Sequence, residues 1–188
     1  MKAKDARAAR SHRALLDAGL ELLLQKPNAT LTEVATHAGV GRATLYRHFD
    51  TREALVKALV LECLQVTEEV VAPIKEQNLG AKAQIEATLR AVVPLADRFH
   101  FLLSLWSIAS DDEQVNQIYE DQLNQLHQII EAAKQEGSIK AGLDSGWIVS
   151  IIDGMLYSAW WMIGQGHLTE EQATEHVLET LFAGVGGE

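Results

Sequence analysis

The sequence has one cysteine in 188 residues, which excludes a framework of intrachain disulfides. This residue, Cys63, lies on the apolar side of a predicted helix, where a packed thiol is a more ordinary role than a reactive one. Residues 1–17 are charged and rich in alanine, and they lack the apolar segment of a signal peptide. We therefore expect a cytoplasmic protein in a reducing setting.

The chain also lacks the residue sets on which catalysis usually depends. It contains no legible Ser/His/Asp or Cys/His set, phosphate-binding glycine loop or multi-ligand metal cluster. His127 and Glu131 stand four apart on a predicted helix, but two ligands without a third are more simply a polar helix surface. We therefore predict no enzymatic activity, no cofactor and no metal site.

Alternation of apolar and polar residues with a period of two is missing, as are internal repeats and low-complexity tracts. Apolar residues instead recur three and four positions apart, which is typical of amphipathic helices. Glycines, prolines and capping residues divide the chain into predicted helices over residues 5–25, 30–38, 42–49, 50–72, 81–93, 94–108, 110–136, 146–163 and from 169 onward. The sequence predicts an all-α fold.

Positive charge is in the minority, with 16 Lys and Arg against 26 Asp and Glu and a net charge of −10. Residues 1–60 nevertheless contain ten Lys or Arg and six acids, a net of +4, so the remainder carries −14. This asymmetry concentrates positive charge at the N-terminal end and favours a nucleic-acid contact there. Solvated helix faces are the alternative interpretation.

Residues 30–49, TLTEVATHAGVGRATLYRHF, form the segment on which the functional prediction depends. Thr30 and Glu33 make a capping box that begins a helix, and Gly39 ends it. A second helix over Arg42–Phe49 buries Leu45 and leaves a basic and aromatic face free. Two short helices joined by a glycine-containing turn place the second helix in the major groove of DNA.

The segment AGVGRATLYRHFDTREAL, preceded by the amphipathic LLDAGLELLLQ, resembles the DNA-binding domain of the TetR family of transcriptional repressors. Gly41 stands where that family often has Ser, Ala43 where it often has Gly, and Lys26-Pro27 replaces the glycine that usually closes the first helix. The departures concern the corner between the first two helices.

The resemblance implies two domains and a set of DNA contacts. A three-helix helix-turn-helix domain over residues 1–52 would be joined by a long helix to a helical effector-binding and dimerisation domain over residues 53–188. Carried over by motif, the phosphate contacts are Thr30, Thr32, Thr44, Tyr46 and Arg52. The residues placed at base edges are Arg42, Ala43, Arg47 and His48.

Residues 146–163, GWIVSIIDGMLYSAWWMI, are apolar on almost every helical face. The run is short for a membrane span and carries Asp153 in its middle, so we expect no membrane partner. Small residues recur every four positions, forming a ridge that suits close helix packing. The family resemblance implies a homodimer, with a predicted interface of Gly146, Ser150, Gly154 and Ser158 facing Val177 and Leu181 of the last helix; ordinary packing within the chain is the alternative.

Eight of the eleven aromatic residues lie between residues 95 and 165. Large side chains at helical spacing form a core or line an apolar ligand site with a few polar groups. With the resemblance, the second interpretation predicts an effector site lined by Phe99, Trp106, Tyr119, Asp153, Tyr157 and Trp160.

Together these features predict a DNA-binding transcriptional regulator, a repressor released from a palindromic operator in double-stranded DNA by a small apolar or aromatic effector. Asp153 leaves a cationic effector open if its side chain faces the ligand. The alternative is a TetR-like DNA-binding protein without a small-molecule effector, controlled by a protein partner.

Overall fold

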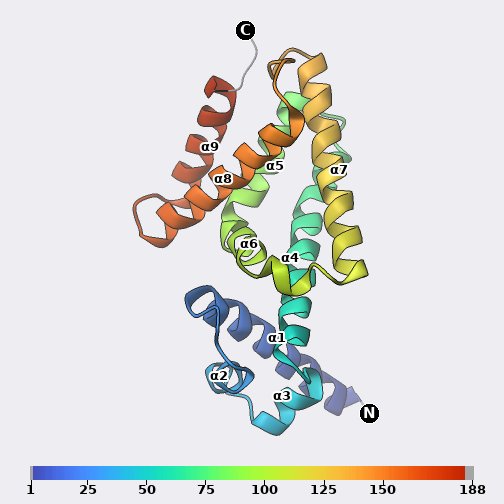
Figure 1. The fold of residues 1–188 in the computed structure, drawn as a ribbon, viewed down its shortest axis with the longest axis vertical. Helices are drawn as coiled ribbons and strands as arrows, with labels where there is room; N and C mark the ends of the chain where they lie inside the picture. The colour runs from blue at the N-terminus through green and yellow to red at the C-terminus, as the bar shows by residue number, and fades with distance from the viewer. Residues whose placement is uncertain (1, 185–188) are drawn as a thin grey trace. The chain divides into compact units, whose positions relative to one another are not determined.

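The computed structural model describes residues 2–184, with side chains from Ala8 onward. Every regular element in this range is helical and no strand is present in it, which confirms the prediction of an all-α fold (Figure 1). The elements are α1 Lys2–Gln25, α2 Leu31–His37, α3 Arg42–His48, α4 Arg52–Lys75, α5 Ala81–Val92, the 3-10 turn η1 Val93–Leu95, α6 Ala96–Ala109, α7 Glu113–Gln135, α8 Ser145–Gly164 and α9 Glu170–Gly184.

The helices form two compact units. The first unit contains the chain up to Cys63 together with Phe101–Asn116, and the second contains Leu64–His100 and the chain from Gln117 onward. Helices α4, α6 and α7 therefore each contribute residues to both units.

The first unit is held together by a buried core under α1, α2 and α3. Leu15, Leu45 and Leu55 are fully buried, and Val34 is nearly so. Gly19 lets α1 approach α4 closely, because a Cβ at this position would lie 3.2 Å from Cδ1 of Leu59. Across the same contact, Arg13 of α1 forms an ion pair with Glu62 of α4. The buried core and these two contacts hold α1, α2, α3 and the start of α4 together.

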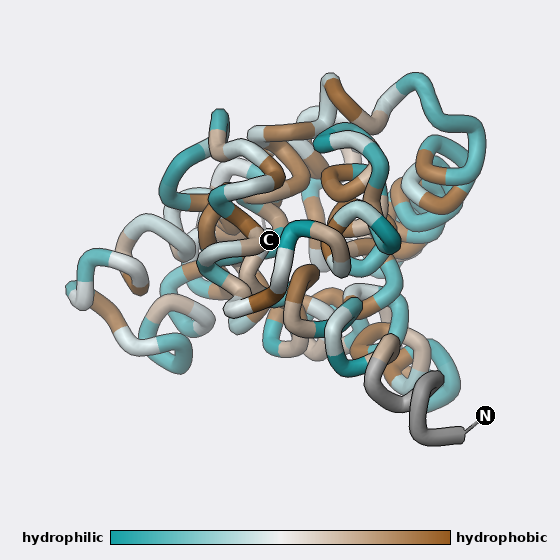
Figure 2. Tube along the Cα trace, turned by 90° about the horizontal axis from the view of Figure 1, so that it is seen from below, coloured by the Kyte–Doolittle hydropathy of each residue, from teal (hydrophilic) through white to brown (hydrophobic). Residues whose placement is uncertain are grey.

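The second unit has its own core, built from α5, η1, the end of α7, and the pair α8 and α9, which lie side by side (Figure 1). By length and composition alone, Ala81–Ala109 and Ser145–Gly164 could cross a membrane. Both segments place apolar residues in this core, among them Ile85, Leu89, Ile148, Ile152 and Leu156. Apolar and polar residues also follow one another at short intervals along most of the trace (Figure 2). Part of the apolar surface of both segments is thus buried inside the protein.

Two predicted helix boundaries differ from the structure. Helix α4 continues to Lys75, so Pro73 lies two residues before its end and does not stop the helix, although proline cannot donate to the carbonyl four residues earlier. The N-terminus of α7 is capped by Asp112, whose Oδ1 accepts from the amides of Gln114 and Val115 at 3.1 and 3.2 Å. The helix predicted over residues 110–136 therefore begins three residues later, at Glu113.

Candidate DNA-binding and effector sites

The turn between α2 and α3 has the geometry of a helix-turn-helix. The amide of Glu33 donates to Oγ1 of Thr30 at 3.3 Å, and the amide of Thr30 donates to Oε2 of Glu33 at 2.8 Å. This reciprocal pair confirms the capping box that begins α2. Helix α2 ends at His37, and Gly39 adopts a φ of +63°, a conformation that favours glycine. Helix α3 then begins at Arg42.

One face of α3 is anchored and the other is free. Leu45 is fully buried and Phe49, directly after the helix, is 4% exposed. Arg42, Ala43, Tyr46 and Arg47 are exposed, whereas Thr44 is half-buried and its Oγ1 accepts from the Arg47 guanidinium at 2.9 Å. The exposed face of this two-turn helix therefore presents the guanidinium groups of Arg42 and Arg47 and the phenol of Tyr46.

His48, the last residue of α3, is less free than its predicted role at a base edge requires. Its ring lies 5.3 Å from the ring of His12 on α1, which itself stacks on Phe49 at 5.3 Å. Burial lowers the pKa of His48, and the nearby His12 and Arg47 lower it further. His48 thus serves as a contact between α3 and α1, and His12 is a neighbour that the local sequence pattern does not reveal.

The remaining predicted phosphate contacts lie at the helix starts. Thr30 is exposed but its hydroxyl is engaged with Glu33, and Thr32 is half-buried on the first turn of α2. Lys26 forms an ion pair of 2.5 Å with Glu33. Hydrogen bonds from Lys26 and from Thr30 lower the pKa of Glu33 to about 2.

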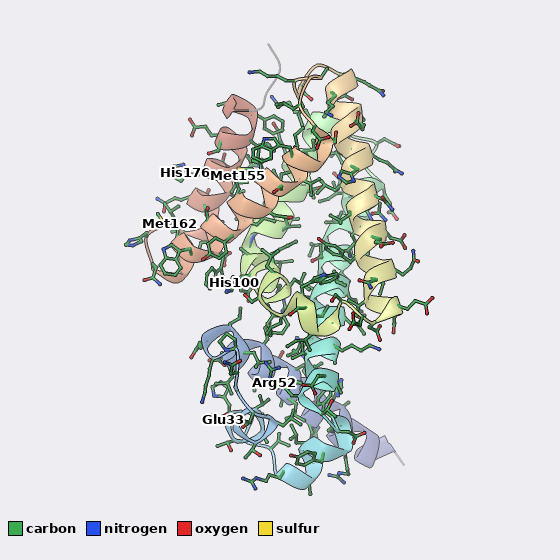
Figure 3. All side chains as sticks on the ribbon, viewed as in Figure 1. Glu33, Arg52, His100, Met155, Met162 and His176 are labelled. Atoms are coloured by element: carbon green, nitrogen blue, oxygen red, sulfur yellow. The ribbon has the colours of Figure 1, made fainter. Side chains whose placement is uncertain are left out.

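Arg52, the first residue of α4, is bound inside its own unit (Figure 3). Its Nε donates to the carbonyl of Ala29 at 3.1 Å, and its Nη2 donates to the carbonyl of Pro27. Both carbonyls lie in the loop between α1 and α2. Sequence reasoning missed this contact because its partners are 23 and 25 residues away.

The second unit contains an aromatic cluster on one stripe of α8. The ring of His100 stacks on Trp160, with centroids 3.5 Å apart, and both rings lie 5.5 Å from Tyr157. Burial lowers the pKa of His100. Four residues before Tyr157, burial raises the pKa of Asp153. The pKa of Tyr119 on α7 is also raised, by burial and then by the charge of Asp153, so Asp153 lies within electrostatic reach of α7.

The predicted effector residues are therefore only partly brought together. Tyr119, Asp153, Tyr157 and Trp160 belong to the second unit, where Phe99 packs against the core. Trp106 belongs to the first unit. His100 of α6 joins Tyr157 and Trp160 in this cluster, and no local sequence pattern encodes that contact between two helices.

The predicted dimer residues separate into two groups. Gly146, Ser150, Gly154 and Ser158 are all exposed on α8. Val177 and Leu181 are 5% and 0% exposed, because α9 turns them into the core of its own chain. Their assignment to the interface was wrong for this reason. The exposed face of α8 instead carries Trp147, Tyr157 and Trp161, which are 60%, 45% and 50% exposed.

Comparison with known proteins adds a family and relatives. A family described as "Bacterial regulatory proteins, tetR family" matches residues 15–59. The HTH-type transcriptional repressor LfrR of Mycolicibacterium smegmatis is 33% identical over 84 residues, which are 45% of this chain and 42% of LfrR. The matched segment thus spans less than half the length of that relative. The fatty acid metabolism regulator protein of Bacillus subtilis is 24% identical over 182 residues, 91% of this chain and 93% of the relative.

Solved structures share the fold over nearly the whole chain. LfrR in complex with proflavine gives a TM-score of 0.75 at 21% identity, covering 96% of this chain and 98% of LfrR. AibR in complex with isovaleryl coenzyme A and operator DNA gives a TM-score of 0.77 at 20% identity, covering 92% and 98%. At these identities the likeness shows the fold alone.

Proposed function

The chain belongs to the TetR family of bacterial regulatory proteins, and from this premise we propose that it is a repressor released from a palindromic operator by a small-molecule effector. It acts in the cytoplasm as a homodimer and has no catalytic role. We place the end of the DNA-binding domain between residues 52 and 53, at the start of α4, whereas the compact first unit continues to Cys63 and also includes Phe101–Asn116.

The observation that carries the DNA-binding proposal is the exposed face of α3. Arg42, Ala43 and Arg47 are exposed and would meet the base edges, and without DNA the Arg47 guanidinium donates to Oγ1 of Thr44. His48 borders this face. Thr30, Thr32, Thr44 and Tyr46 supply phosphate contacts from the starts of α2 and the flank of α3. Phosphate contacts position a protein on the duplex, and base contacts specify the sequence.

Selection of duplexes from a random pool tests this assignment. Arg42 is the residue best suited to bidentate recognition of guanine, a contact worth about 1 to 3 kcal/mol of discrimination. Arg42→Ala should relax the preference at one base pair in each half-site. Tyr46→Phe should weaken binding to every sequence about equally. An unchanged selected motif with Arg42→Ala would remove Arg42 from the base contacts.

The dimer proposal is supported by the exposed surface of α8. Its small residues Gly154 and Ser158 are exposed, as are Tyr157 and Trp161, so a second copy could approach closely and cover the aromatic rings. A two-fold dimer places two copies of α3 about 34 to 36 Å apart, or a multiple of this, on a palindrome.

The effector proposal is supported by the aromatic stripe of α8 and by Asp153. A half-buried carboxylate within electrostatic reach of Tyr119, on the same helix as Tyr157 and Trp160, suits an aromatic compound with a positive charge. Proflavine, the ligand in the LfrR structure, is an aromatic compound and a suitable first probe. Asp153→Asn should weaken a cationic aromatic ligand more than its neutral analogue, measured by quenching of tryptophan fluorescence. Equal loss of both would exclude a charge role for Asp153.

The alternative is a regulator controlled by a protein partner without an effector. The net charge of −14 beyond residue 60 favours it, since an acidic body suits a basic protein surface. Operator binding that responds to no small molecule would support this alternative, whereas release by one compound would support the effector.

A further inference from the structure

Arg52 makes a contact that differs from the role its position in the motif implies. Its guanidinium spans two backbone carbonyls, Ala29 through Nε at 3.1 Å and Pro27 through Nη2. The side chain is half-buried, and Ala29 is fully buried. A residue that reaches out to a phosphate would instead point its guanidinium away from the protein.

The two carbonyls occupy a sensitive place in the chain. Helix α1 ends at Gln25, and Thr30 caps α2, so Pro27 and Ala29 form the corner between these helices. The C-terminal end of α1 carries partial negative charge, which a guanidinium next to it stabilises. The planar fork of arginine can also meet two acceptors at fixed directions, which an ammonium group does less well.

The corner between α1 and α2 determines where α3 lies. Thr30 begins α2, and α2 buries Leu31, Val34 and Ala35 in the core of the first unit. The turn after α2 leads directly into α3, so a displacement of the start of α2 changes where α3 lies. Arg52 ties this start to the first turn of α4.

We propose that Arg52 is a positioning residue for DNA recognition: it fixes the corner between α1 and α2 on α4 and so sets the alignment of α3 with the base edges. The inference rests on the proposed DNA-binding function. It assigns the positive charge of Arg52 to the protein backbone and leaves the phosphates to Thr30, Thr32, Thr44 and Tyr46.

Specific and nonspecific binding separate this role from its alternatives. Nonspecific affinity depends on phosphate electrostatics, whereas specific affinity also needs α3 in register with the bases. A lost phosphate contact lowers both affinities equally and reduces the salt slope by about one. A lost positioning contact lowers the ratio of specific to nonspecific affinity. A purely stabilising contact lowers the unfolding temperature and leaves that ratio unchanged in folded protein.

The experiment compares Arg52→Lys and Arg52→Gln with the full-length wild type. Affinity is measured for a duplex selected by the wild type and for a random duplex, at several salt concentrations and at a temperature where circular dichroism shows folded protein. Two controls are Tyr46→Phe, for a phosphate contact, and Lys57→Gln, which breaks the ion pair between α4 and Asp112 in the same unit.

We expect Arg52→Lys to reduce the ratio of specific to nonspecific affinity by about tenfold, with an unchanged salt slope, because it keeps the charge and loses the fork. Arg52→Gln should show a similar ratio, and Lys57→Gln should retain that of the wild type. If Arg52→Gln does not fold, Arg52→Lys decides alone. A wild-type ratio for Arg52→Lys would overturn the inference and leave the proposed function intact. A wild type that selects no duplex would overturn both.

Discussion

At the scale of single residues, the carboxylate of Glu33 is bound by three donors. It accepts from the amide and the hydroxyl of Thr30, each at 2.8 Å, and from Lys26 at 2.5 Å. These bonds favour its ionised form and lower its pKa to about 2, below the ordinary value of 4.5. A carboxyl group with a lowered pKa makes the free energy of unfolding depend on pH.

The direction of that dependence follows from the sign of the shift. The contribution of Glu33 is complete above the unfolded pKa near 4.5 and is lost as the pH falls toward about 2. We therefore expect the difference in stability between wild type and Glu33→Gln to shrink over this pH range. Urea unfolding at a series of pH values measures it, with Glu120→Gln on α7 as the control. A constant difference from pH 6 to pH 3 would contradict the prediction.

Leu181 offers a second prediction at this scale, because its side chain has no exposed surface within its own chain. Leu181→Ala should lower the free energy of unfolding by about 2 to 5 kcal/mol, the usual cost of a buried leucine truncation. Leu103→Ala, at a leucine that is 55% exposed, should change it by less than about 0.5 kcal/mol. Similar effects of the two substitutions in urea unfolding would argue against the observed packing of α9.

At the scale of elements, α8 has one buried and one exposed face. Its buried face packs with α9, and Gly154 lies on the other face, where an added Cβ would meet no atom of the chain within 4 Å. Replacing a glycine in the middle of a helix also favours the helix by about 1 kcal/mol.

Gly154→Leu should therefore keep or raise the stability of the single chain and weaken the dimer, because leucine would block the close helix approach. Sedimentation velocity over a concentration series measures the dimer, and Gly142→Leu is a control at a glycine in the turn before α8, where an added side chain also has open space. An unaltered dimer with Gly154→Leu would place the interface elsewhere.

The elements also show which signals a sequence carries. The capping box predicted for α2 is confirmed by the bonds of Thr30 with Glu33, and Thr169 and Gln172 form the same reciprocal bonds at the start of α9, because the residues of each box lie three apart. Gly39 and Gly137 were predictable as helix ends, and both have positive φ.

Longer-range contacts left no such signal. The bonds of Arg52 and the stacking of His100 on Trp160 join residues more than twenty positions apart, so no local pattern encodes them. Val177 and Leu181 have the spacing of an apolar helix face, and that spacing cannot say whether the face meets its own chain or a second copy. The remaining site roles, which depend on DNA and effector, stay predictions.

At the scale of the whole molecule, repression and release require that effector and operator compete through the protein. An effector that binds both states equally shifts nothing, and coupling free energies are commonly about 1 to 3 kcal/mol. Reciprocity then requires that operator DNA weaken effector binding by the factor with which effector weakens operator binding.

Titration of an effector identified by release of DNA, with and without saturating operator, measures this factor through tryptophan fluorescence. The two effector affinities should differ by about 5- to 150-fold, and the DNA affinities with and without effector should differ equally. A random duplex in place of the operator serves as the control. Identical effector affinities in the presence and absence of operator would exclude the mechanism.

The first unit is also discontinuous along the chain, since Phe101–Asn116 completes it from beyond residues 64–100. A fragment ending at Cys63 would omit the buried Phe101 and Leu105 and would leave Lys57 without Asp112. The first unit therefore cannot be transferred to a foreign sensor domain by a single gene fusion after Cys63. A working chimaera would have to contain both stretches of this chain. Recombination that exchanges only the residues up to Cys63 would leave out Phe101–Asn116 and with it part of the core of the first unit.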